Sequence, residues 1–468
     1  MEKKSLIEMS PRQALFFATI IVAILGYTMI NLEWAPQISL VLVICFLLLL
    51  GVVKKVRFKA MQDSMADGVM TGIGALYLFS FIGLLVSALM MSGAIPTLMY
   101  HGFDFISPHL FYVSAFVLTS IVGVAIGSSL TTCATIGVAF ISMAGFFDAN
   151  LAITAGAIVS GAFFGDKMSP LSDTCSIASS VVGIDLFEHI RNMMYTTVPA
   201  WILTVLFLWF LSPEAGVTDL SKVTVLQDQL INSGLVHDYA LIPFVALVVL
   251  AVLKVHAIYT IALTIVLSII ITYIHSSPSM EQLGAYFFVG YSLPEGVDLG
   301  DVGKLLSRGG LKSMFFSQVL IIFALSVGGL LQALGILPAL LRGIRHLITS
   351  AGRAVAAAAL TSLGVNVLIG EQYLSILLSG NAFRPEFIRL GLHPKNLART
   401  IEDAGTVINP LVPWSVCGVF ISNVLGIAVL DYLPYAFFCT LSLVLTLIFG
   451  FTGLTISRLS PEEQRALA

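Results

Sequence analysis

The sequence predicts an all-α polytopic membrane protein with about 10 transmembrane helices, two helical hairpins and two inverted repeats that contain broken helices. Its composition is 58% hydrophobic and only 10% charged, whereas a typical soluble domain is about 25% charged. Many stretches reach the roughly 18–20 apolar residues that are needed to cross a bilayer. Polar, proline-containing segments interrupt these stretches at corresponding places in the two halves of the chain, which predicts broken helices.

The first half of the chain contains both clean and interrupted apolar stretches. No small-residue cleavage site follows the first one, so we expect it to be an uncleaved span. The stretch at 112–146 is interrupted by the polar tip 127–132 (GSSLTT), and the next one is interrupted at 165–174 (GDKMSPLSDT). The clean spans of this half are predicted at 13–30, 37–53, 70–92 and 193–211.

The second half repeats the first at a nearly constant offset. Residues 92–96 (SGAIP) align with 334–338 (LGILP) at an offset of 242, and Ser129 falls on Glu371 at the same offset. A two-residue gap brings the two proline-containing breaks into register at an offset of 240, which sets Asn409 opposite Ser169. We therefore expect a duplicated unit whose second tip lies at 366–372 and whose second break lies at 403–413.

Positive charge gives the orientation of the two repeats. If 112–146 and 354–383 are hairpins and the amino terminus is cytoplasmic, 18 of the 23 Lys and Arg residues lie inside, four lie outside and Lys167 lies in the membrane. This distribution obeys the positive-inside rule. It gives the repeats opposite orientations, which is typical of secondary transporters. The predicted units are N-terminal helices at 1–59, transport repeat 1 at 60–212, a polar connection with two helices and a polar loop at 213–308, transport repeat 2 at 309–455, and a cytoplasmic tail at 456–468.

The segment 165–174 is the main candidate site, because a charge deep in lipid costs roughly 2.5–3.5 kcal/mol and needs a partner, an ion or water. Its alternative is a short polar loop between two helices. Asp166 and Asp173 are the main candidates, since one buried carboxylate can hold either a proton or sodium. Lys167 either neutralises one of these carboxylates in the empty site or extends to the membrane surface. Proline in each break frees backbone carbonyls that suit a hard cation.

Further polar residues extend the candidate site into the hairpins and the second repeat. Glu371 and Asp403 are secondary candidates that could instead be structural ion-pair partners, and Asn409 is a candidate neutral ligand. The eight histidines are expected mostly at membrane edges or in loops, and the five cysteines are expected as small core residues without disulfides or metal-ligand spacing. The remaining secondary candidates are the tip hydroxyls Ser128, Ser129, Thr131 and Thr132.

The segment 165–174 resembles the signature of the NhaC-type sodium/proton antiporter family, and length, hydropathy and the second proline-containing break agree over most of the chain. The resemblance implies inverted repeats, paired hairpins and a homodimer in the cell membrane. It implies that Asp166, Ser169, Asp173 and Thr174 line a sodium and proton site. The sequence departs from the family pattern at 175–177 (CSI), where another Thr or an Asn often follows. The expected function is therefore export of Na⁺ in exchange for H⁺, with a carboxylate antiporter of the malate/lactate type or an amino-acid exchanger as alternatives.

Other classes of function fit the residues poorly. An intramembrane aspartyl protease resembles a Gly-x-Gly-Asp helix paired with a Tyr-Asp helix, but the sequence before Asp166 is Phe163-Phe164-Gly165. A channel would give passive flux without coupling to protons. We expect no enzymatic activity, no resident cofactor and no nucleic-acid partner. The expected partners are membrane lipid, the transported Na⁺ and H⁺, small carboxylates under the alternative, and a second copy of the chain.

Overall fold

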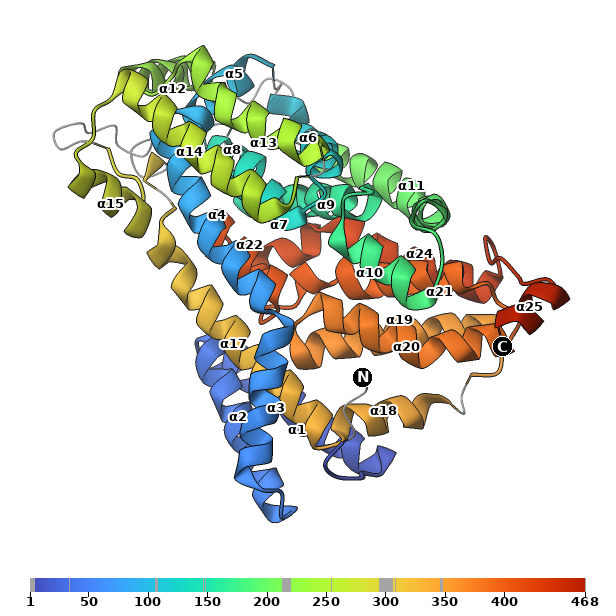
Figure 1. The fold of residues 1–468 in the computed structure, drawn as a ribbon. Helices are drawn as coiled ribbons and strands as arrows, with labels where there is room; N and C mark the ends of the chain where they lie inside the picture. Colours follow the sequence, from blue (N-terminus) through green and yellow to red (C-terminus); the bar gives the residue numbers. More distant parts are fainter. Residues whose placement is uncertain are drawn as a thin grey trace.

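A computed structural model describes residues 5–32, 34–105, 108–145, 147, 149–212, 220–253, 255–293, 306–307, 309–345 and 348–467. Helices dominate the described part of the chain, as Figure 1 shows, and its one β-feature is an isolated bridge between Leu392 and Arg458. Among the described residues, seven helices are long and apolar enough to cross a membrane, or up to 10 if each of three bent helix pairs counts as one span. The predicted all-α membrane fold is confirmed. Two parts of the polar connection and loop predicted at 213–308, residues 213–219 and 294–305, lie outside the described residues.

The amino-terminal helices form a pair that packs on the second half of the chain. They are α1 (Pro11–Gly26), extended by η1 (Tyr27–Asn31), and α2 (Pro36–Val53). Ser10 begins α1 with a capping box in which Ser10 and Gln13 satisfy each other's backbone N–H groups. Apolar side chains of both helices form a core with α17 (Leu311–Ala333) and α18 (Ile336–Arg345).

The first repeat contains the predicted hairpin and the predicted broken helix. The hairpin runs out along α6 (Phe111–Ile126), turns at Gly127 and returns through α7 (Ser129–Thr132), η3 (Cys133–Gly137) and α8 (Val138–Ala144). The broken helix consists of α9 (Leu151–Met168) and α10 (Asp173–Val182), which the segment 169–172 separates. The other helices of this repeat are α3 (Phe58–Thr71), α4 (Ile73–Met91), α5 (Ala94–Phe105), η2 (Pro108–Leu110) and α11 (Leu186–Leu211).

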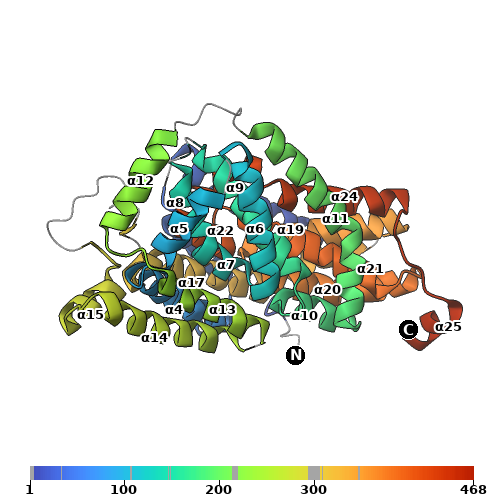
Figure 2. The same cartoon turned by 90° about the horizontal axis from the view of Figure 1, so that it is seen from above.

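A group of middle helices connects the repeats and packs beside α4, α5 and α6 (Figure 2). It comprises α12 (Leu220–Asn232), η4 (Asp238–Leu241), α13 (Ile242–Val252), α14 (Ala257–His275) and α15 (Met280–Phe288).

The second repeat has the same order of elements. Its hairpin is α19 (Ala351–Ile369) and α20 (Gln372–Arg389), which meet at Gly370. Its broken helix runs from α21 (Pro394–Ile401) through the π-helix η5 (Glu402–Thr406) and the short η6 (Asn409–Leu411) to α22 (Val416–Leu425). The last elements are α23 (Val429–Tyr432), η7 (Leu433–Tyr435), α24 (Phe437–Thr452) and α25 (Pro461–Leu467).

Helix ends show the register between the repeats. Equivalent caps lie 243 residues apart, because Gly127 and Gly370 both end a helix in the left-handed conformation, as do Gly183 and Gly426. The residues that begin equivalent helices keep this spacing, and the pairs are Ser128 with Glu371, Asn150 with His393, and Ser172 with Ser415.

This register corrects the sequence alignment. The sequence set Ser129 opposite Glu371 and Ser169 opposite Asn409, whereas the caps set Ser128 opposite Glu371 and Asp166 opposite Asn409. The sequence alignment was wrong because it matched proline and glycine letters, and the break of repeat 1 has one proline where that of repeat 2 has two. The caps match Pro170 with Pro413 and leave Pro410 opposite Lys167.

The repeats run in opposite directions. Figure 1 shows α4 rising from α3 toward α5, whereas its counterpart α17 descends from the region of α15 toward α18. The predicted inversion is therefore visible in the path of the chain.

Small residues hold the first hairpin tightly against the first broken helix. A Cβ atom added at Gly165 would lie 2.4 Å from Gly123 Cα, and one added at Gly161 would lie 2.0 Å from Thr119 Oγ1. Within a membrane, such small residues allow two helix backbones to approach and gain van der Waals contact. Hairpin and broken helix therefore form one packed unit, which fixes the hairpin tip beside the break.

Candidate ion-binding site

Asp166 lies where the first hairpin tip meets the first break. It is in the last turn of α9, and its side chain is 5% exposed. Its Oδ2 atom accepts hydrogen bonds from Ser129 Oγ at 2.7 Å and from Ser129 N at 3.3 Å. Its Oδ1 atom accepts from Ser172 Oγ at 2.6 Å. The hairpin and the break thus each contribute a hydroxyl to one buried carboxylate.

Local sequence explains why these groups converge. Gly127 adopts φ 71°, which ends α6 and turns the chain at the hairpin tip. Ser128 then begins α7 by accepting from Thr131 N, and this leaves Ser129 N in the first helical turn, free to donate to Asp166. On the other side, Ser172 begins α10 and faces back toward Asp166.

Several predicted residues join this junction through hydroxyl groups. Thr174 Oγ1 lies 2.9 Å from Ser172 Oγ, so it adds an oxygen to the same group. Ser169 Oγ accepts from Leu171 N at 3.2 Å and therefore shapes the break itself. The tip hydroxyls bond locally, Thr131 Oγ1 to Ser128 Oγ at 3.1 Å and Thr132 Oγ1 to Ser128 O at 2.8 Å. All these side-chain oxygens are suited to a hard cation.

The structure separates Asp173 from Asp166. Asp173 is exposed in the first turn of α10 and makes no side-chain hydrogen bond or ion pair with any described residue, whereas Asp166 is buried. Tyr373, in the first turn of α20 in the other hairpin, interacts electrostatically with Asp173, Glu371 and Asp166. The phenol therefore lies near all three carboxylates, and the sequence analysis did not select it.

Lys167 pairs with Asp403 across the repeats. Both side chains are fully buried, and Lys167 Nζ donates to Asp403 Oδ1. Thr196 Oγ1 donates to Asp403 Oδ2 at 2.9 Å, and Thr446 Oγ1 also donates to this atom. Of the alternatives open for Lys167, extension to the membrane surface is wrong, and so is pairing with Asp166 or Asp173. For Asp403, the structural ion pair is the alternative that the structure favours.

The second break forms a neutral junction around Asn409. Asn409 Nδ2 donates to Asn366 Oδ1 at 2.9 Å and to Gly370 O at 3.3 Å, both on the opposing α19 and its end. Its Oδ1 atom accepts from Cys417 N at 3.1 Å. Glu371 begins α20 by accepting from Leu374 N at 2.7 Å, so its carboxylate is engaged at the hairpin tip. The expected second tip and second break are therefore in contact, as in the first repeat.

The sequence analysis missed a buried histidine. His189 on α11 is fully buried, whereas the histidines were expected mostly at membrane edges or in loops. Nearby atoms belong to Cys175 and Glu402, and one ligand atom from each of the three residues lies within 4.8 Å of the others. The one signal in the sequence was the position of His189 in the charged run 188–191 (EHIR), directly before an apolar stretch. The five cysteines are free, and four of them are buried, but Cys45 is exposed on α2, so its expected place in the core is wrong.

Broken helices of opposite orientation, with a buried carboxylate among hydroxyls at a hairpin tip, define a secondary transporter of the inverted-repeat class. The model of the Na⁺/H⁺ antiporter family matches residues 161–454. The chain is 36% identical over 459 residues to the Na⁺/H⁺ antiporter NhaC of Alkalihalophilus pseudofirmus, covering 98% of both chains.

Two relatives from Bacillus subtilis are also similar to this chain. The Na⁺/H⁺ antiporter NhaC is 39% identical over 400 residues, covering 84% of this chain and 87% of the relative. The malate-2H⁺/Na⁺-lactate antiporter is 32% identical over 432 residues, covering 92% of both. This chain belongs to the Na⁺/H⁺ antiporter family.

Proposed function

We propose that this protein is a sodium/proton antiporter of the cell membrane that exports Na⁺ in exchange for H⁺. The observation that carries the proposal is Asp166, a buried carboxylate that the hairpin tip and the helix break surround with hydroxyl groups. Na⁺ is a hard cation, and such cations prefer carboxylate and neutral oxygen ligands. Asp166, Ser129 and Ser172 would hold sodium, with Thr174 beside them. Membership of the antiporter family supports the same function.

The two repeats supply the means of exchange. The site lies at the interface of a hairpin with a broken helix, and the Lys167–Asp403 pair ties that helix to the second repeat. In secondary transporters, movement of one repeat against the other opens such a site to one side at a time. Binding of sodium on the inside and its release outside would then alternate with the reverse movement of a proton.

Flux into proteoliposomes tests this function. Vesicles that contain the purified protein and an internal pH indicator should alkalinise or acidify when a sodium gradient of either direction is imposed. Potassium at the same concentration should produce a much smaller change. A sodium gradient that leaves the internal pH unchanged, while the protein is inserted and folded, would refute the proposal.

A second candidate function is the exchange of small carboxylates coupled to sodium and protons. The similarity to the malate-2H⁺/Na⁺-lactate antiporter favours it, and the tip hydroxyls Ser128 and Thr131 could bind a hydroxyl-bearing substrate. The same vesicles distinguish the candidates if malate is placed on one side and lactate on the other. Sodium-dependent proton flux without either acid supports simple exchange, whereas flux only with both acids supports the carboxylate antiporter.

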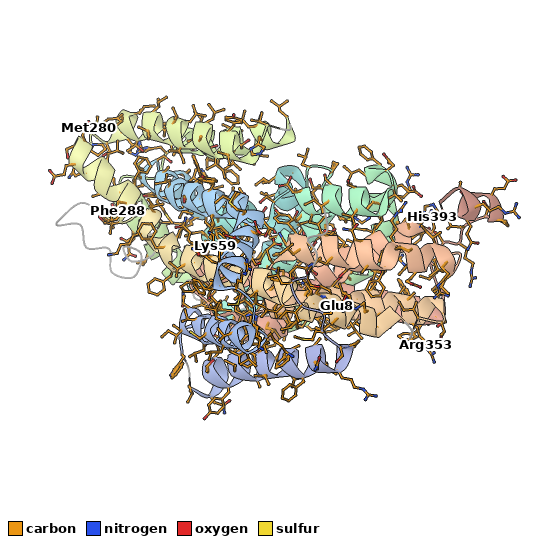
Figure 3. The ribbon with its side chains drawn as sticks, turned by 60° about the horizontal axis from the view of Figure 1, so that its bottom comes forward. Glu8, Lys59, Met280, Phe288, Arg353 and His393 are labelled. Carbon is orange, nitrogen blue, oxygen red and sulfur yellow. The ribbon has the colours of Figure 1, made fainter. Side chains whose placement is uncertain are left out.

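The orientation is part of the proposal, with both termini in the cytoplasm. Figure 3 shows Arg353 and His393 at one end of the molecule and Met280 and Phe288 at the other, and the proposal places these two ends on opposite sides of the membrane. Single cysteines at Lys395 and Met280, in a background with Cys45 replaced by Ser, should react differently with an impermeant reagent outside intact cells. We expect labelling at Met280 only. Labelling at Lys395 would contradict this orientation.

The native mass in detergent tests the proposed homodimer.

A further inference from the structure

Glu402 and His189 form a second buried polar group, distinct from the Asp166 junction. Glu402 is on the π-helix η5 of repeat 2, and His189 is on α11 of repeat 1. Both side chains are fully buried, and His189 Nε2 lies 3.9 Å from Glu402 Oε2. π-helical turns are rare and occur frequently at functional sites. The pair thus joins the two repeats at an unusual backbone position.

These two side chains have no other partners among the described residues. Both carboxylate oxygens of Glu402 and both ring nitrogens of His189 are buried without a hydrogen bond. An isolated charge in such surroundings would be very costly. The pair is stable only if it holds one proton, either as a carboxylic acid beside a neutral imidazole or as a carboxylate beside an imidazolium. The arrangement of Glu402 and His189 therefore suits the binding of one proton.

Cys175 lies beside the pair, and its thiol is already engaged. Its Sγ atom donates to Lys167 O at 3.2 Å and to Asp166 O at 3.7 Å. A thiolate, which is the form that binds a metal ion, could not donate these bonds. The Cys175 proton is thus in use, and the cluster of Cys175, His189 and Glu402 is better suited to a proton than to a metal ion.

Two buried carboxylates compete for a proton in the sodium-free protein, and their hydrogen bonds differ. Asp166 accepts from Ser129 N, Ser129 Oγ and Ser172 Oγ, and these donors stabilise its ionised form. Glu402 accepts from none. We propose that Glu402 and His189 hold the proton that is exchanged for sodium, while Asp166 stays ionised and holds the sodium ion. This inference rests on the proposed sodium/proton exchange.

The surroundings couple the two sites. Asp166 and Glu402 interact electrostatically, so sodium at Asp166 cancels a negative charge that favours the proton on Glu402. The proton then leaves to water on the side to which the transporter is open.

The helices α19 and α20 contact η5 through neutral groups, since Asn366 Nδ2 donates to Gly405 O and Ser375 lies beside Gly405. Asp166 and Cys175 interact electrostatically with Glu402. The elements that contact η5 also carry Lys167 on α9, Arg399 on α21 and Cys439 on α24, and Asp403 follows Glu402 on η5 itself.

Sodium affinity measured against pH tests the proposal. With EDTA present, to exclude bound transition metals, wild type should bind sodium up to tenfold more tightly per pH unit between about pH 6 and 9. Glu402→Gln mimics the neutral pair but cannot release a proton. Its sodium affinity should be independent of pH. In vesicles this variant should retain exchange of ²²Na⁺ for Na⁺ and lose proton-driven sodium flux. Cys175→Ser, whose hydroxyl can still donate, is the matched control and should behave as wild type.

Specific outcomes would overturn the proposal. A wild-type pH profile in Glu402→Gln would place the proton on Asp166, and loss of sodium binding at pH 9 in the folded variant would make Glu402 part of the sodium site. If Glu402→Gln does not fold, His189→Leu decides. Without the imidazole, Glu402 should hold the proton more tightly, and the pH profile of sodium affinity should move to higher pH. An unchanged profile would overturn the proposal. Absence of sodium binding in wild type would refute the proposed function itself.

Discussion

The two breaks share a backbone and differ in their chemistry. Asp166 and Asn409 occupy equivalent positions 243 residues apart, and each meets the tip of its own hairpin. Asp166 accepts hydrogen bonds from its tip, whereas Asn409 donates to its tip. The first junction therefore carries a negative charge among hydroxyls that can turn toward a cation, and the second is neutral with donors and acceptors matched. The two equivalent positions thus differ by one side chain, and the sodium site that we propose lies at the first.

Asp166→Asn makes the two breaks chemically alike and should have the largest effect. A unit charge pair at 4 Å is worth about 4 kcal/mol at an effective dielectric constant of 20, so sodium affinity should fall by roughly 1,000-fold. Sodium-dependent proton flux should disappear, while the elution volume of the variant in size-exclusion chromatography should match that of wild type. Sodium binding within tenfold of wild type would remove Asp166 from the ion site.

Asp173→Asn is the matched control for this change, because Asp173 lies only seven residues further on but is exposed. A charge in contact with water contributes about 1 kcal/mol at 4 Å. We therefore expect sodium affinity to fall by less than about tenfold, with flux retained. Complete loss of flux would instead give Asp173 the central role that the sequence analysis shared between both aspartates.

Lys167→Met breaks the ion pair that connects the repeats. It leaves Asp403 buried without its charged partner, and removal of one member of a buried pair costs about 3–5 kcal/mol. The melting temperature in detergent should fall markedly. Lys167→Met combined with Asp403→Asn should recover much of the loss, since no unpaired charge remains. If the double variant is as unstable as the single one, the pair is not the source of the effect.

Asn409→Asp tests whether the second break can be given the charge of the first. Asn366 Oδ1 and Gly370 O would lose the donor that they share, and unmade buried hydrogen bonds cost about 1–3 kcal/mol. The variant should melt at a lower temperature without sodium and recover in part when sodium is added. Asn409→Ala, which loses the same donor without gaining a charge, should be destabilised but insensitive to sodium. Equal stability of Asn409→Asp and wild type would contradict the matched junction.

The smallest effect is expected at His393, which begins α21 where Asn150 begins α9. Its Nδ1 atom accepts from Lys395 N at 3.3 Å, and burial and the Lys395 charge lower the pKa of His393 despite opposing effects of Glu188 and Glu463. The folded state thus favours the neutral ring. This contribution to stability is complete above the ordinary pKa near 6.5 and is lost as pH falls through the lowered value. His393→Asn should flatten that part of the dependence of melting temperature on pH. An identical slope would contradict it.

Much of the architecture could be predicted from the sequence, because apolar length and charge distribution are local properties. The hairpin tips and the segment 165–174 were found through residues that lipid tolerates poorly, such as Asp166 and Lys167. Their partners could not be found in the same way. Lys167 meets Asp403 and His189 meets Glu402 only through packing between repeats, and no local pattern records such contacts. The predicted register between the repeats was also wrong, because the repeats share the positions of their helix caps and few identical residues.

The Lys167–Asp403 pair has a consequence for how the chain enters the membrane. The two residues are 236 positions apart, and at about 5–20 residues per second a ribosome needs roughly 10–50 s to make the intervening chain. During that time Lys167 lacks Asp403, its partner in the folded protein. Its helix Leu151–Met168 has a mean hydropathy of 1.2, the lowest value among the seven candidate spans of the described chain. We expect this helix to remain at the insertion machinery or the membrane surface until the second repeat is synthesised. The other helices of the first repeat would then insert early, and this helix would insert last.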